Sequence, residues 1–199
     1  MKLFNRLVVL SLNLIIVSIV TGCASNPNAE SWKLPKKESP ESAMIIGRVD
    51  ITHNKTENPD GDLLYLQAVN FMLKDEVYWW DGSGEKNFVL DNNYFIVPNI
   101  KPGKYYFRGF YTAHGFNTVT DPSTIEDKDY IDVKAGEIKF VGSFDYVKNS
   151  RSFVEKIKNM GTFQLRKTPH PTEKEMLQWL NRIGAGSGWE AAIKKRIQQ

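Results

Sequence analysis

Residues 130–147 read YIDVKAGEIKFVGSFDYV, and this stretch decides the fold class. Apolar and polar residues alternate through its second half, a period of two that is typical of a half-buried β-strand. Ala135-Gly136 is turn chemistry between two such runs, so the stretch predicts strand, turn and strand. One face is predicted to hold Ile138, Phe140, Phe144 and Tyr146, and the other Lys139, Ser143 and Asp145.

Similar short runs, separated by turn signals, recur from residue 43 to residue 167. Residues 43–52 (AMIIGRVDIT) place Ile45, Val49 and Ile51 on one predicted face. Residues 62–73 are apolar on both faces, which fits either a buried central strand or a short helix. Further strands are predicted at 77–80, 87–90, 94–97, 104–112, 152–157 and 162–166. Many short strands at this spacing predict one mainly β domain, an antiparallel β-sandwich or barrel.

Lys101-Pro102-Gly103 separates two of these predicted strands. Proline followed by glycine suits the central positions of a type II turn, in which the second position has a positive φ. The sequence therefore predicts that Gly103 has a positive φ and resists replacement by a larger residue.

The C-terminal residues 168–199 change to a helical period. Thr172 followed by Glu175 is a capping-box pattern, and apolar residues then recur at helical spacing. Ser187-Gly188-Trp189-Glu190 predicts a second helix start by the same logic. We expect a two-helix hairpin packed on the β domain. Its predicted buried residues are Met176, Leu177, Trp179, Leu180, Ile183, Trp189, Ile193 and Ile197.

Composition excludes several classes of protein. The 199 residues are 41% hydrophobic and carry a net charge of only +3, which fits a globular chain and argues against a nucleic-acid partner. A single cysteine excludes an internal disulfide framework and a cysteine-rich zinc module.

The N-terminal residues 1–22 have the pattern of an export signal. Lys2 and Arg6 precede an apolar run over residues 7–20, which is short for a membrane span. The run ends in Val20-Thr21-Gly22-Cys23, which resembles the lipobox of bacterial lipoproteins. The resemblance implies cleavage before Cys23, fatty acylation of Cys23 and, because residue 24 is alanine, export to the outer membrane. An ordinary signal peptide or an uncleaved anchor helix remains the alternative.

Residues 23–42 are rich in Ser, Pro, Asn, Lys and Glu and show little apolar periodicity. This composition predicts a flexible tether between the acylated cysteine and the β domain over residues 43–167. Trp32 is expected to contact either lipid headgroups or the domain.

A second resemblance covers residues 43–147. The segment from Phe95 to Ile100, followed by Pro102-Gly103-Lys104-Tyr105, resembles the corner of prealbumin-like (carboxypeptidase regulatory-like) β-sandwiches. Residues 135–142 (AGEIKFVG) are similar to a strand of small bacterial lipoproteins that carry such domains. The resemblance implies a single antiparallel sandwich of prealbumin or immunoglobulin type and a non-catalytic module.

No catalytic, metal or cofactor motif is found. The serines in Gly82-Ser83-Gly84 and Gly186-Ser187-Gly188 lack the spacing of a hydrolase nucleophile, and the three histidines show no paired spacing. The candidate surface for a ligand or partner is aromatic, unless a second layer such as the C-terminal helices covers it. Its predicted residues are Trp79, Trp80, Tyr106 and Arg108.

These patterns predict a lipid-anchored cell-envelope protein that faces the periplasm and has a non-catalytic interaction or structural role. Its expected partners are the membrane, through the lipid on Cys23, and an envelope protein or glycan. The alternative is a module that binds glycan or peptidoglycan through the aromatic face, and an envelope enzyme is a third hypothesis.

Overall fold

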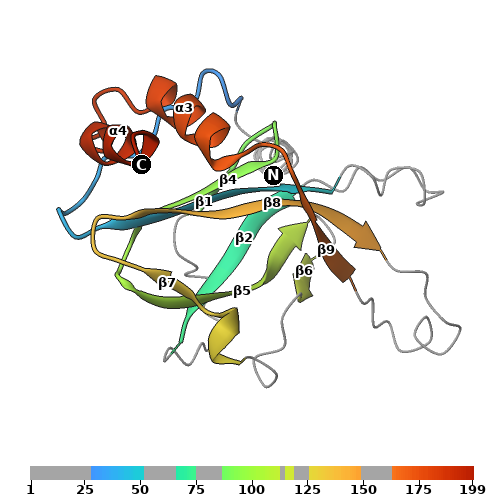
Figure 1. Ribbon diagram of the computed structural model, residues 1–199. Coiled ribbons are helices and arrows are strands. Elements are labelled where there is room, and N and C mark those ends of the chain that lie inside the picture. The colour runs from blue at the N-terminus through green and yellow to red at the C-terminus, as the bar shows by residue number, and fades with distance from the viewer. Residues whose placement is uncertain (1–27, 52–65, 75–86, 113–114, 119–125, 149–162) are drawn as a thin grey trace, which may run out of the picture.

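Two β-sheets and two C-terminal helices make up the described part of the chain (Figure 1). The computed structural model describes residues 28–51, 66–74, 87–112, 115–118, 126–148 and 163–199. The strands are β1 (Ala43–Asp50), β2 (Leu66–Leu73), β3 (Phe88–Val89), β4 (Tyr94–Ile100), β5 (Gly103–Thr112), β6 (Gly115–Thr118), β7 (Ile131–Val133), β8 (Ile138–Lys148) and β9 (Phe163–Thr168). The helices are the 3-10 turn η3 (Asp127–Asp129), α3 (Glu173–Ile183) and α4 (Glu190–Ile197).

The mainly β prediction is confirmed, and residues 66–73 form a strand and not a helix. The predicted strands at 77–80 and 152–157 lie outside the described residues. The larger sheet has the order β3-β4-β1-β8-β9, and the smaller has β2-β5-β6, with β7 also paired to β5.

The pairing of β1 with β8 is parallel, so the prediction of a wholly antiparallel arrangement is wrong. β7 and β8 follow each other in sequence but belong to different sheets. β8 therefore does not pair with the strand that precedes it, and it lies beside β1 in the same direction. The amide of Met44 donates to the carbonyl of Glu137 at 2.9 Å, which aligns the starts of β1 and β8. β4 and β5 are likewise consecutive strands in different sheets.

The corner between β4 and β5 differs from the predicted type II turn. Gly103 is the first residue of β5 and has no positive φ, whereas Asn99 has a φ of 60°. Asn99 lies where the β1–β4 register shifts, opposite Ala43 and Met44. The left-handed residue therefore sits in a bulge at the end of β4, which an asparagine tolerates well.

A second bulge explains why the predicted faces of β8 are mixed. The register of β8 against β1 skips between Phe140 and Ser143, and Gly142 there has a φ of 121°. Before the bulge, Ile138 and Phe140 pack beneath the helices, whereas Phe144 after it packs between the sheets. The prediction that these three share one face is wrong because the bulge inverts the alternation. The side chain of Tyr146 lies outside the described residues.

Strand β1 is buried on both faces. Ile45, Val49 and Ile51 lie between the two sheets, as predicted. Met44 and Ile46 point the other way and pack under the helices. The core between the sheets also contains Ala43, Val69, Phe71, Val89, Phe95, Val97, Ile100, Tyr105, Phe110 and Val133.

The helical hairpin covers the outer face of the larger sheet (Figure 1), as predicted. The side chain of Thr172 caps α3, and the reciprocal contact from Glu175 completes the predicted capping box. The second predicted box is wrong, because α4 has Trp189 at its N-cap, and the Ser187 hydroxyl accepts from the Trp189 amide. The residues predicted as buried do pack in this second core, and Ile197 is partly buried.

Residues 28–42 form a strap that packs along the helices, in contrast to the flexible tether predicted from their composition. Leu34 is 5% exposed, and its amide donates to the Ile183 carbonyl at 3.3 Å. The Lys37 amide donates to the Ser187 carbonyl at 2.7 Å. Trp32 packs on the body, with its ring centroid 5.0 Å from that of Phe88.

Asn99 holds the end of this strap against the sheet. Its side-chain oxygen accepts from the Glu38 amide at 3.0 Å, and its side-chain nitrogen donates to the Lys36 carbonyl at 2.9 Å. The bulge in β4 therefore orients the Asn99 side-chain amide, which supplies hydrogen-bond partners to backbone groups of the strap that no strand pairs with.

Two glycine substitutions test this packing. A Cβ on Gly47 would overlap the Phe95 ring and lie 2.8 Å from the backbone oxygen of Gly142, which cannot easily move. We expect Gly47→Ala to lower the free energy of unfolding by about 1–3 kcal/mol, the usual cost of overpacking. A Cβ on Gly103 would overlap only the end of the flexible Leu73 side chain. The other neighbour, the Tyr105 ring on the same strand, would lie at an ordinary contact distance of 3.9 Å.

Gly103→Ala is the matched control, and we expect it to change the free energy of unfolding by less than about 1 kcal/mol. Urea denaturation of both variants measures the difference. An equal loss in the two variants would contradict this account of the β1 core.

Candidate binding cleft

Of the site residues predicted from the sequence, the structure describes Tyr106 and Arg108, both on β5. Cys23, Trp79 and Trp80 lie outside the described residues. Tyr106 is 5% exposed, and its hydroxyl donates to the Met72 sulfur at 3.2 Å. Burial raises the pKa of the Tyr106 phenol, and the nearby charge of Arg108 opposes that rise.

The ring of Tyr106 is therefore not an exposed stacking surface. It meets the ring of Tyr130 edge-on, with the centroids 6.1 Å apart. The C-terminal helices are not the layer over it, because they pack on the sheet formed by β1, β4 and β8. An aromatic platform would thus depend on Trp79 and Trp80.

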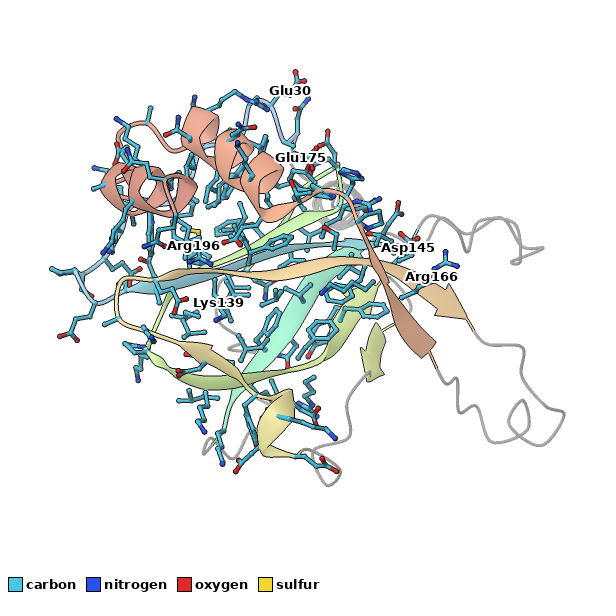
Figure 2. All side chains as sticks on the ribbon, viewed as in Figure 1. Glu30, Lys139, Asp145, Arg166, Glu175 and Arg196 are labelled. Atoms are coloured by element: carbon cyan, nitrogen blue, oxygen red, sulfur yellow. The ribbon has the colours of Figure 1, made fainter. Side chains whose placement is uncertain are left out.

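The described residues instead form a cleft of about 960 Å³ at one end of the larger sheet. The strap, the turn before β4, the end of β1, the link between β9 and α3, and one face of α3 surround it. In Figure 2, Glu30 and Glu175 lie above the sheet, and Asp145 and Arg166 lie at its end. The lining residues are Asn28, Ala29, Glu30, Arg48, Asp91, Asn92, Tyr94, His170, Pro171, Glu175, Gln178, Trp179 and Arg182.

The cleft rests on a group of paired charges at the ends of β1 and β8. Arg48 forms ion pairs with Asp50 and, at 3.7 Å, with Asp145. Arg166 on β9 donates to Asp145 at 3.3 Å, and the side-chain nitrogen of Asn93 donates to Asp50 at 3.3 Å. Both aspartates are only 8% exposed, so their charges require these partners.

Helix α3 presents one face to the cleft. Glu175, Gln178, Trp179 and Arg182 follow each other at helical spacing, and all line it. The Trp179 ring meets the Tyr94 ring edge-on with centroids 5.0 Å apart, which joins α3 to β4. Burial raises the pKa of the Tyr94 phenol. The positive charges of Arg48 and Arg182 lower this pKa, and the negative charge of Glu175 raises it further.

Glu175 is the most strongly perturbed carboxylate of the cleft. It accepts from the Thr172 amide at 2.7 Å and from the Thr172 hydroxyl at 2.9 Å, and the His170 ring lies 3.1 Å away. These hydrogen bonds lower the pKa of the Glu175 carboxyl from 4.5 to about 2, and the one from the Thr172 backbone has the largest effect. Glu175 is therefore ionised at neutral pH while it faces the cleft.

Most of the residues that line the cleft are polar or charged. Within the described ranges, no group of three or more His, Cys, Asp or Glu residues is placed to hold a metal ion. No helix among the same residues is long and apolar enough to cross a membrane.

Sequence reasoning missed this cleft, although part of its signal is visible. Arg48 and Asp50 interrupt the apolar run of β1 at alternate positions, and Asp145 does the same in β8. Opposite charges on one face of two neighbouring strands indicate a paired cluster. The residues that the strap and the turn before β4 contribute to the cleft show no comparable pattern in the sequence.

No family model matches the chain, and no curated protein or solved structure is significantly similar to it. The cleft is therefore interpreted from its own residues.

The pKa of Glu175 predicts a pH dependence of stability. Because its folded pKa lies below the unfolded value, its contribution is complete above about pH 4.5 and is lost as the pH falls toward 2. Glu175→Gln keeps a side chain that can accept in the capping box but removes the titrating group. We expect the stability difference between wild type and variant to shrink steadily from pH 5 to pH 2.

Urea denaturation at several pH values measures this difference. Glu41→Gln, at the exposed end of the strap where the Glu41 carbonyl accepts from the Gly136 amide, is the control for loss of a carboxylate outside the capping box. A difference that is constant from pH 5 to pH 2 would contradict the role of the ionised carboxylate.

Proposed function

We propose that this chain is a lipid-anchored protein of the bacterial cell envelope with a non-catalytic binding role. The observation that carries the proposal is the lipobox-like Val20-Thr21-Gly22-Cys23, in which the only cysteine of the chain stands at the acylated position. Alanine at position 24 favours the outer membrane, with the body facing the periplasm.

The start of the packed body supports this proposal. Ala29 is only 4% exposed, and its amide donates to the Asp91 carboxylate at 2.9 Å. Asn28 lies five positions after Cys23, and a fully extended chain over five steps reaches roughly 17 Å. A lipid on Cys23 would hold this end of the body close to the bilayer.

The finer fold assignment belongs to the same proposal. We propose that the two sheets form a sandwich related to prealbumin-like modules, although the parallel β1–β8 pair departs from a purely antiparallel pattern. The shared core between the sheets supports it. Because a fold alone does not assign a function, the binding role is argued from the cleft at one end of the larger sheet.

Replacement of Cys23 tests the anchor. In a bacterial host that processes lipoproteins, we expect the wild type to incorporate labelled palmitate. Its mass should be that of an acylated chain that begins at residue 23. Cys23→Ala should incorporate no palmitate and should be absent from the outer-membrane fraction, because no acyl chain is present to hold it.

Ser25→Ala is the matched control, since it alters a neighbouring small residue and leaves the thiol in place. It should behave as the wild type. A wild-type protein whose Cys23 sulfur carries no lipid would overturn the proposed anchor, whatever its distribution between fractions.

A further inference from the structure

We propose that the cleft binds a cationic peptide segment of a partner protein. This inference rests on the proposed binding role of the body and gives it a ligand class. It does not require that Cys23 is acylated, so the two proposals can fail separately.

The first argument is the charge that remains after pairing. Arg48 and Arg166 are matched by Asp50 and Asp145, with contacts of 3.7 Å and 3.3 Å among them. The other charged residues that line the cleft are one arginine, Arg182, and three carboxylates, Glu30, Asp91 and Glu175. Carboxylates therefore outnumber the arginines that remain after pairing, which disfavours phosphates and other polyanions.

The second argument is the position of the carboxylates. The Glu175 carboxylate is ionised at neutral pH, the hydrogen bonds of the capping box hold its pKa at about 2, and its side chain is 51% exposed. Glu30 on the strap is also exposed and lines the same cleft. The two carboxylates come from different elements and face a common space, so cationic side chains of one ligand can reach both.

The third argument concerns the backbone of the ligand. Asn28, Asn92 and Gln178 line the cleft between the charged groups. A side-chain amide both donates and accepts hydrogen bonds, as a peptide group does. A volume of about 960 Å³ accommodates several residues of an extended segment. Stacking of a sugar ring is less well supported, because Trp179 is only 6% exposed.

The test is a titration of the full-length protein, purified in mild detergent, with two blocked peptides at low salt. One is Lys-Gly-Lys-Gly-Lys, and the other has glutamate in place of each lysine. We expect saturable binding of the lysine peptide that weakens as salt is added, and no saturable binding of the glutamate peptide. Calorimetry measures both titrations.

Charge variants locate the site. Glu30→Gln and Glu175→Gln should each weaken binding of the lysine peptide about two- to fivefold, the range of an exposed ion pair. Arg182→Gln should strengthen it by a similar factor, because it removes the cation that competes with the ligand. Glu41→Gln, at the other end of β1, should leave the affinity unchanged.

The opposite sign at Arg182 separates charge recognition from simple loss of folding, since a destabilised variant would bind less tightly and not more. Binding of a neutral chito-oligosaccharide in place of the lysine peptide would overturn the proposal in favour of a glycan. Preference for the glutamate peptide, equal effects of Glu30→Gln and Glu41→Gln, or no binding of any probe would also overturn it. Palmitate labelling of Cys23 is unaffected by each of these outcomes.

Discussion

The structure depends on β1, a single strand that is buried on both faces. Its inward residues, such as Ile45 and Val49, fill the space between the sheets, and its outward residues Met44 and Ile46 lie under the helices. Two hydrophobic cores therefore share one strand, and neither the smaller sheet nor the helical hairpin can leave without exposing one face of it. Gly47 lets the Phe95 ring lie against the middle of this strand.

The cleft arises where this arrangement ends. The outward face of β1 is apolar beneath the helices and becomes charged at Arg48 and Asp50, past the start of α3. The bulge at Gly142 shifts the alternation of β8 by one residue, so that Asp145 reaches Arg48 while the Ser143 hydroxyl donates to the Pro171 carbonyl at 2.6 Å. The same irregularity that mixes the faces of β8 thus positions both the charged floor and the start of α3.

Local signals predicted what depends on neighbouring residues. These features are the described strands other than β6, the first capping box and the Ala135-Gly136 turn, where Gly136 has a φ of 70°. Sheet membership and the parallel β1–β8 pair depend on contacts that are distant in sequence, so a period of two cannot reveal them. Composition misjudged residues 28–42 because only a few apolar residues, such as Leu34, anchor that strap. The remaining anchors are backbone hydrogen bonds, which any sequence can form.

The strap connects the proposed anchor with the cleft. It contributes Asn28 and Glu30 to the cleft wall and then follows the helices, where Lys37 lies over the Trp189 ring at 4.8 Å and Pro35 accepts from its indole nitrogen at 3.2 Å. A chain fixed to a bilayer at Cys23 would therefore meet the body at the cleft, without a long free linker between them. Such a short attachment would restrict how far the cleft can move from the membrane, and so which partners it can reach.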